Sequence, residues 1–126
     1  MYDDPTFTFP DYTQNGGTAI LTCDWGYNRN DLLVEMFRMH RTGQELLGAY
    51  KVFTATTRAS TPKITRVSQS PRVSLLQVEV VTQNNLTIFL EKVLSQDHGT
   101  YWCSIQAAGT TPKHESNRTE LNLSGK

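Results

Sequence analysis

Two cysteines are the residues of this chain best suited to covalent chemistry. Cys23 and Cys103 are the only cysteines and stand eighty positions apart. They form either two buried thiols or one disulfide, and their places on two well-marked β-patterns favour the disulfide. A disulfide implies an oxidising compartment. Closing a loop of this length stabilises a fold by roughly 4 kcal/mol in the chain-entropy model.

The second cysteine ends the most informative motif of the chain, Asp97-His98-Gly99-Thr100-Tyr101-Trp102-Cys103. Its Asp-x-Gly start predicts a tight turn into a strand. The Tyr101 hydroxyl, two residues before the cysteine, is placed to hydrogen-bond back to that turn. Cys23 closes an alternating run over 18–23 that places Ala19 and Leu21 on the same face as its sulfur. The two patterns predict two strands that each present one sulfur to a shared core.

Catalytic and metal-binding chemistry finds little support in the sequence. His40, His98 and His114 fall on different predicted strands or turns, and no nucleophile motif accompanies them. A zinc site needs several convergent cysteine or histidine ligands, and a disulfide would use both cysteines. The chain has no glycine-rich phosphate loop. We therefore expect no enzyme, no metal and no cofactor.

The length of the chain indicates a single domain, 1–126. A chain of 126 residues buries roughly two thirds of its unfolded surface. The formal net charge is zero, so we expect no nucleic-acid partner. No run approaches the ~20 apolar residues of a membrane span, and Met1-Tyr2-Asp3-Asp4 is unlike a signal peptide. We expect a monomeric part of a single-pass cell-surface protein whose anchor lies elsewhere, without a small-molecule substrate.

Three Asn-x-Ser/Thr sequons agree with secretion. They begin at Asn85, Asn117 and Asn122. Each is a candidate glycosylation site, although such triplets are common by chance.

Short β-forming runs between turn residues predict an all-β fold. We expect strands over 6–13, 18–25, 32–40, 45–52, 72–80, 86–93, 99–106 and 116–123. The run 86–93 alternates most clearly, with Leu86, Ile88 and Leu90 inward. The stretch 54–70 is rich in threonine and serine and poor in large apolar residues. We expect it to be a long, flexible connection in which a further strand is short or absent.

One ion pair is predicted at the base of the fold. Arg72 opens the strand expected over 72–80, and we expect it to pair with Asp97. Arg66 is the competing candidate. The alternative is a surface arginine that contributes little to stability.

Strand parity predicts a patch of side chains that faces solvent. Because Cys103 points inward, Trp102 points outward, and residues on the neighbouring strand alternate in the same way. A cluster of aromatic and methionine side chains with a polar rim resembles a protein-binding hot spot. The patch comprises Phe37, Met39 and Trp102, joined by Leu46 or Tyr50 and ringed by Glu35, Gln106 and Lys113. The alternative is that the strand expected over 45–52, or the loop after Cys103, covers Trp102 or Phe37.

These features resemble the variable-type (V-set) immunoglobulin family over nearly the whole chain. The resemblance implies a two-sheet Greek-key sandwich with one disulfide between the sheets. Such domains usually bury a tryptophan against the disulfide; here Met36 takes that position, and methionine fills irregular space well. Two segments further resemble the inhibitory T-cell receptors of the programmed cell death type. They are Phe37-Arg38-Met39 with Glu45-Leu46-Leu47-Gly48-Ala49-Tyr50, and Pro112-Lys113-His114-Glu115-Ser116-Asn117-Arg118-Thr119-Glu120-Leu121.

The second resemblance implies an inhibitory immune receptor of T cells that binds B7-type immunoglobulin ligands on another cell. Binding would use the front sheet, which contains the strands over 32–40, 45–52, 99–106 and 116–123. The contacts carried over to this chain are Glu35, Phe37, Leu46, Gln106, Ala108, Thr111, Lys113 and Glu115. This face is more polar than the family pattern at Gln106 and Lys113 and more apolar at Leu46.

Two other functions on the same fold remain as alternatives. An antigen-receptor variable domain usually carries Gly-x-Gly in its last strand, and 110–123 contains no glycine. A sialic-acid lectin of this fold needs an arginine on the strand over 99–106, and 95–108 contains none. The fold alone does not separate these functions, because function depends on the site.

Overall fold

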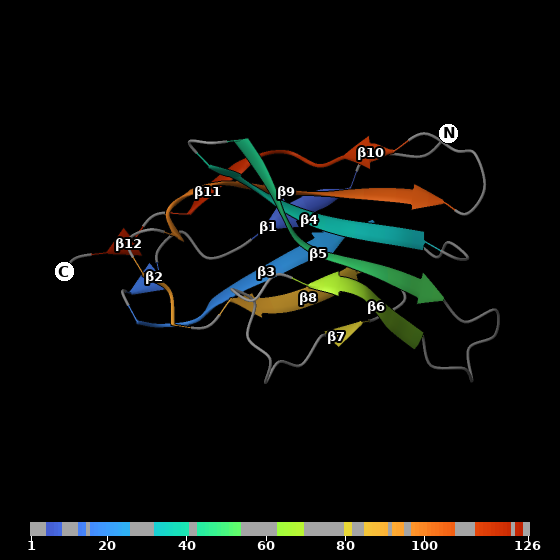
Figure 1. The fold of residues 1–126 in the computed structure, drawn as a ribbon, viewed down its shortest axis with the longest axis horizontal. Helices are drawn as coiled ribbons and strands as arrows, with labels where there is room; N and C mark the ends of the chain where they lie inside the picture. Colours follow the sequence, from blue (N-terminus) through green and yellow to red (C-terminus); the bar gives the residue numbers. More distant parts are fainter. Residues whose placement is uncertain are drawn as a thin grey trace.

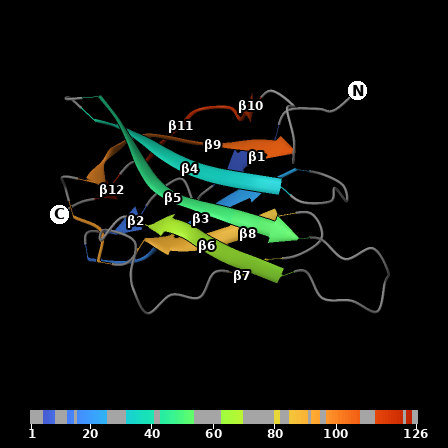
Figure 2. The same ribbon diagram turned by 45° about the vertical axis from the view of Figure 1, so that its right-hand side comes forward.

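The chain folds into two β-sheets that pack face to face (Figure 1 and Figure 2). The computed structural model describes residues 5–8, 13–14, 16–25, 32–40, 43–53, 63–69, 80–81, 85–90, 92–94, 97–107, 113–121 and 123–124. Within these ranges no helix is long and apolar enough to cross a bilayer.

The back sheet is the smaller of the two. Its strands run in the order β1 (Thr6–Thr8), β3 (Ala19–Asp24), β8 (Asn85–Leu90) and β7 (Val80–Val81). Alternation explains this sheet, because the odd-numbered residues of β3 and the even-numbered residues of β8 are buried while Ile20 on the other face is exposed. The inward positions predicted for Leu86, Ile88 and Leu90 are confirmed.

The front sheet carries most of the remaining strands. Its order is β10 (His114–Glu115), β9 (Gly99–Ala107), β4 (Leu32–His40), β5 (Gly43–Phe53) and β6 (Lys63–Gln69), and β11 (Thr119–Leu121) also pairs with β9. All of these pairs are antiparallel. A separate parallel pair joins β12 (Leu123–Ser124) to β2 (Thr13–Gln14).

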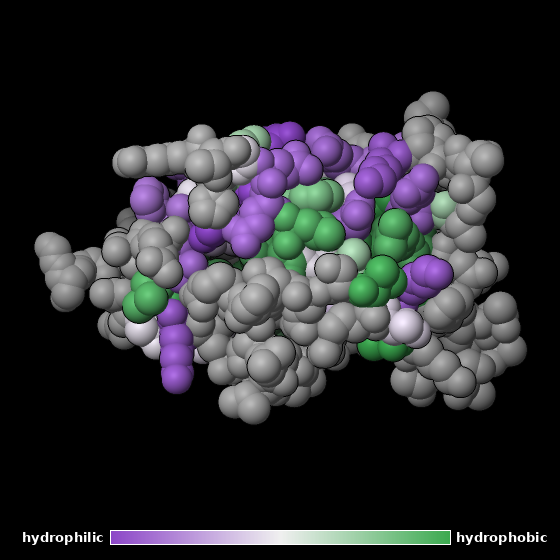
Figure 3. All heavy atoms as spheres, viewed as in Figure 1, coloured by the Kyte–Doolittle hydropathy of each residue, from purple (hydrophilic) through white to green (hydrophobic). Residues whose placement is uncertain are grey.

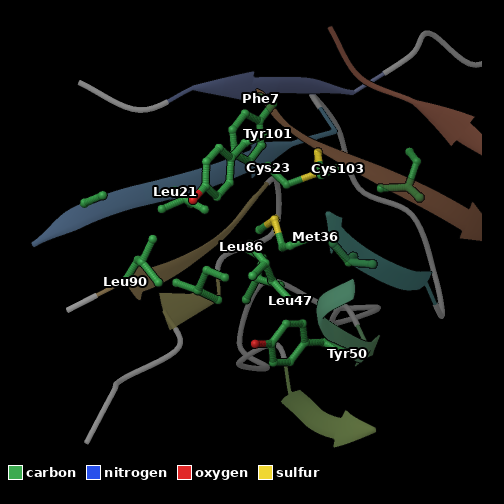
Figure 4. Packing of buried hydrophobic residues seen from close by; sticks show 14 of the residues in the cluster. Phe7, Leu21, Cys23, Met36, Leu47, Tyr50, Leu86, Leu90, Tyr101 and Cys103 are labelled. Carbon is green, nitrogen blue, oxygen red and sulfur yellow. A yellow bond between two sulfur atoms is a disulfide. The ribbon is translucent and has the colours of Figure 1, made fainter. Parts of the chain in front are cut away.

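A disulfide between Cys23 and Cys103 links the two sheets, as predicted. Met36 lies opposite Cys103 in the ladder between β4 and β9, and it is fully buried. Figure 4 shows Met36 between the disulfide and Leu86. Methionine therefore occupies the core position that the family usually gives to tryptophan.

The turn before β9 has the expected geometry. The Tyr101 hydroxyl donates to the Asp97 carbonyl oxygen at 2.5 Å, and the Asp97 carboxylate accepts from the Leu94 N–H at 2.8 Å. Gly99 has a φ of +147° and lies against the Met39 carbonyl, so a side chain there would be strained. The predicted hydrogen bond from the Tyr101 hydroxyl back to this turn is confirmed.

Three predicted strands differ from the structure. Of the strand expected over 6–13, only 6–8 form β1, which pairs with β3. Thr13 begins a second strand, β2, which pairs with β12. The strand expected over 116–123 is divided into β10, β11 and β12. The further strand that we expected to be short or absent within 54–70 is β6, seven residues long and paired with β5. Backbone pairing to β5 forms this strand, although its sequence offers few large apolar side chains.

Two other predicted features fall on residues outside those described. Of the strand expected over 72–80, the structure describes only Val80, in β7. The flexibility expected for 54–62 likewise lies outside the described residues.

Candidate functional site

An aromatic pair lies at the centre of the outer face of the front sheet. Phe37 on β4 is directly opposite Trp102 on β9. Their ring centroids are 5.4 Å apart, and the planes differ by 20°, so the rings stack. This contact stabilises the two strands against each other.

The aromatic pair is covered, and the prediction that Trp102 faces solvent is wrong. Trp102 is 0% exposed and Phe37 only 8%. Trp102 is nevertheless absent from the cluster between the sheets, so strand parity gave its side of the sheet correctly. The Arg118 guanidinium lies 3.8 Å from the centre of the Trp102 ring and covers it. No described residue accepts a hydrogen bond from the buried Trp102 indole N–H.

Ion pairs border the aromatic pair. Arg118 approaches the Glu115 carboxylate at 3.4 Å, with both side chains about half exposed. Lys113 lies 2.7 Å from the carboxylate of Glu35, whose side chain is only 14% exposed. The Ser104 hydroxyl donates to the same carboxylate at 3.4 Å. Lys113, which directly precedes β10, therefore reaches across β9 to Glu35 on β4.

Apolar side chains at the other border remain accessible. Met39 is 43% exposed, and Leu46 on β5 is partly buried opposite Phe37. Figure 3 shows hydrophobic residues near the middle of this view and hydrophilic residues along its upper edge, where β9, β10 and β11 run. We call the group Phe37, Met39, Leu46, Trp102 and Arg118 the front patch.

The comparison with known families identifies the fold. The model of the immunoglobulin V-set domain matches residues 12–124, which is most of the chain. The chain belongs to the immunoglobulin V-set family. V-set domains are typically extracellular or cell-surface modules that mediate protein–protein interactions, and they are generally not enzymes. No match was found among curated proteins.

Tyr50 does not join the front patch of this V-set domain. It is fully buried in the core, at the opposite end of the cluster from Phe7 (Figure 4). The cause is a bulge in β5: Met36 faces Gly48 while Phe37 faces Leu46, so Leu47 is an extra residue. One extra residue reverses the alternation. Leu46 therefore stays on the outer face, whereas Tyr50 turns inward.

The structure describes some of the other predicted ligand contacts and sequon residues, but not all of them. Gln106 is partly buried, and Lys113 and Glu115 are exposed. Ala108, Thr111 and the sequon residue Asn122 lie outside the described residues. Asn85 lies on β8 and is partly buried, and Asn117 lies between β10 and β11.

Arg38 is an important residue that sequence reasoning missed. It is buried and contacts the carboxylates of Asp97 at 3.3 Å and Glu45 at 2.9 Å. The predicted partner Arg72 and the side chain of Arg66 lie outside the described residues, so the Arg72–Asp97 pair stays a prediction. A signal was available, because the alternation that turns Met36 inward also turns Arg38 inward. A buried arginine requires carboxylate partners.

The described side chains of the front sheet combine stacked rings, exposed apolar groups and ion pairs. They include no group of three or more His, Cys, Asp or Glu residues that could hold a metal ion. Stacked rings, an exposed methionine and bordering ion pairs suit contact with another protein.

Proposed function

We propose that this domain is the ligand-binding ectodomain of an inhibitory immune receptor, carried on T cells, and that it binds a B7-type immunoglobulin protein. The front patch is the observation that supports ligand binding through the front sheet. The class of receptor and ligand rests on the two segments that resemble receptors of the programmed cell death type. Both segments contribute to this patch, the first through Phe37, Met39 and Leu46 and the second through Arg118.

The composition of the front patch supports contact with a protein. An apolar centre with a charged border is the usual arrangement of an interface hot spot. Met39 and Leu46 offer adaptable apolar contacts, and Glu35, Lys113 and Glu115 supply polar contacts at the edge. Trp102 contributes indirectly, because it is covered and packs against Phe37 and Arg118.

Binding measurements with the unmodified domain test the ligand class. Surface plasmon resonance against a panel of B7-type ectodomains is expected to identify at least one ligand, while a glycan array gives no signal. Met39→Ala should weaken the interaction about tenfold or more, because Met39 is 43% exposed and lies in the front patch. Circular dichroism serves as the control for folding. A domain that binds glycans and none of the B7-type proteins would contradict the proposal.

A further inference from the structure

The last strand of the front sheet carries an irregularity that the proposed function does not use. In the ladder with β9, Glu115 lies opposite Ser104 and Thr119 lies opposite Tyr101. Glu115 and Thr119 are four residues apart, whereas their partners Ser104 and Tyr101 on β9 are three residues apart. The segment 116–118 is therefore a β-bulge with one extra residue, and bulges commonly redirect side chains.

Ser116 keeps the bulge attached to β9. Its N–H donates to the Cys103 carbonyl oxygen at 2.8 Å, and its hydroxyl accepts from the Cys103 N–H at 2.9 Å. The same hydroxyl donates to the Asn117 carbonyl oxygen at 2.8 Å. A serine side chain thus replaces a backbone partner in the ladder, which leaves the next residue free to turn away from β9.

Asn117 turns towards the first strand of the back sheet. Its Oδ1 accepts from the Phe7 N–H at 3.0 Å, and its Nδ2 donates to the Phe7 carbonyl oxygen at 3.1 Å. Nδ2 also donates to Thr119 Oγ1 at 3.0 Å. The side-chain amide pairs with Phe7 as a neighbouring strand would, and it joins the edges of the two sheets.

These bonds use both hydrogens of the Asn117 amide. An asparagine side chain has two N–H donors, and here one is bonded to Phe7 and the other to Thr119. Asn117 also begins the sequon Asn117-Arg118-Thr119. An N-linked glycan replaces one of the two amide hydrogens, so a glycosylated Asn117 retains one donor for two acceptors. A sugar at this nitrogen would also have to fit beside β1.

We propose that Asn117 is a structural clasp between the two sheets, and that the folded domain carries it without a glycan. Of the three sequons, this one serves the fold instead of accepting a sugar. The clasp also has a consequence for the front patch, because the same bulge places Arg118 over Trp102. The inference concerns the free domain and does not depend on the identity of any ligand.

The first test is site occupancy. The domain is secreted from animal cells that glycosylate proteins, and the folded monomer is analysed by glycopeptide mass spectrometry. Asn117 is expected to be unmodified in most molecules. A glycan on most molecules of the folded monomer would overturn the proposal.

The second test separates the clasp from the sequon. Asn117→Asp removes both donors and places a carboxylate against the Phe7 carbonyl, and it should lower the melting temperature by about 5–10 °C. Thr119→Ala also removes the sequon but retains both bonds to Phe7, and its loss should be less than half as large. Equal melting temperatures for the two variants would overturn the clasp.

A measurement on the unmodified domain covers the case in which Asn117→Asp does not fold. The Phe7 amide is expected to be protected from hydrogen exchange, because Asn117 accepts its hydrogen. Exchange of this amide at the rate of an unstructured peptide would show that the clasp is not formed.

Discussion

At the scale of single residues, Arg38 is the clearest test of what holds the base of the sandwich together. Removal of its guanidinium leaves the buried Asp97 without the cation at 3.3 Å. Arg38→Ala should therefore lower the free energy of unfolding by about 2 kcal/mol or more. Urea denaturation measures the change.

A matched variant gives the expected contrast. Glu45 contacts the same guanidinium at 2.9 Å, but its side chain is more exposed than that of Asp97. Glu45→Ala should cost less than about 1 kcal/mol, because solvent reaches the partly exposed Glu45 carboxylate and screens its charge. If both variants cost the same, burial does not determine the strength of this network.

Arg118 is predicted to shield Trp102 from solvent. In a Trp25→Phe background, Trp102 is the only tryptophan. Arg118→Ala should then shift its fluorescence to longer wavelength and increase quenching by acrylamide severalfold, at a cost of about 1 kcal/mol in stability. Arg118→Leu retains an apolar cover and should leave quenching close to that of the parent. Unchanged quenching in both variants would show that another group covers the indole.

The positions near the disulfide were predictable because Cys103 fixes the parity of its strand. From that single reference, the sequence indicates that Met36 is inward and that Trp102 lies on the outer face. Exposure was not predictable in the same way. Parity gives the side of a sheet but not what lies above it, and Arg118, which covers Trp102, is 15 positions from Cys103 in sequence.

At the scale of elements, irregular pairing explains most of the differences between prediction and structure. The bounds of β4 were predicted as observed, because turn residues flank a continuous β-forming run. Tyr50 was assigned to the wrong face because an extra residue in β5 leaves no clear mark in the sequence. The division of the last strand at 116–118 has the same origin.

The bulge in β5 requires a glycine next to it. A Cβ at Gly48 would collide with the Tyr50 ring and hydroxyl. Gly48→Ala should destabilise the domain by about 1–3 kcal/mol through overpacking, as measured by urea denaturation. In a Tyr50→Phe background the loss should be smaller, because the hydroxyl is the nearest atom. An equal loss in both backgrounds would place the cause in the backbone of Gly48.

At the scale of the whole molecule, the disulfide and the buried cluster hold the two sheets together as one scaffold. Replacing both cysteines by alanine should lower the free energy of unfolding by about 4 kcal/mol, since the disulfide closes a loop across 80 positions. Calorimetry on the oxidised and the cysteine-free domains measures this difference. A loss below about 1 kcal/mol would mean that the core alone holds the sheets together.

Each sheet has one outer face, and the central claim is that the outer face of the front sheet binds a protein. Met39 on the front sheet and Ile20 on the back sheet are matched controls, because they are 43% and 44% exposed. The decisive measurement is the affinity of Met39→Asp and Ile20→Asp for a B7-type ectodomain that binds the unmodified domain. We predict at least a tenfold loss for Met39→Asp and no change for Ile20→Asp. A loss confined to Ile20→Asp would contradict the account.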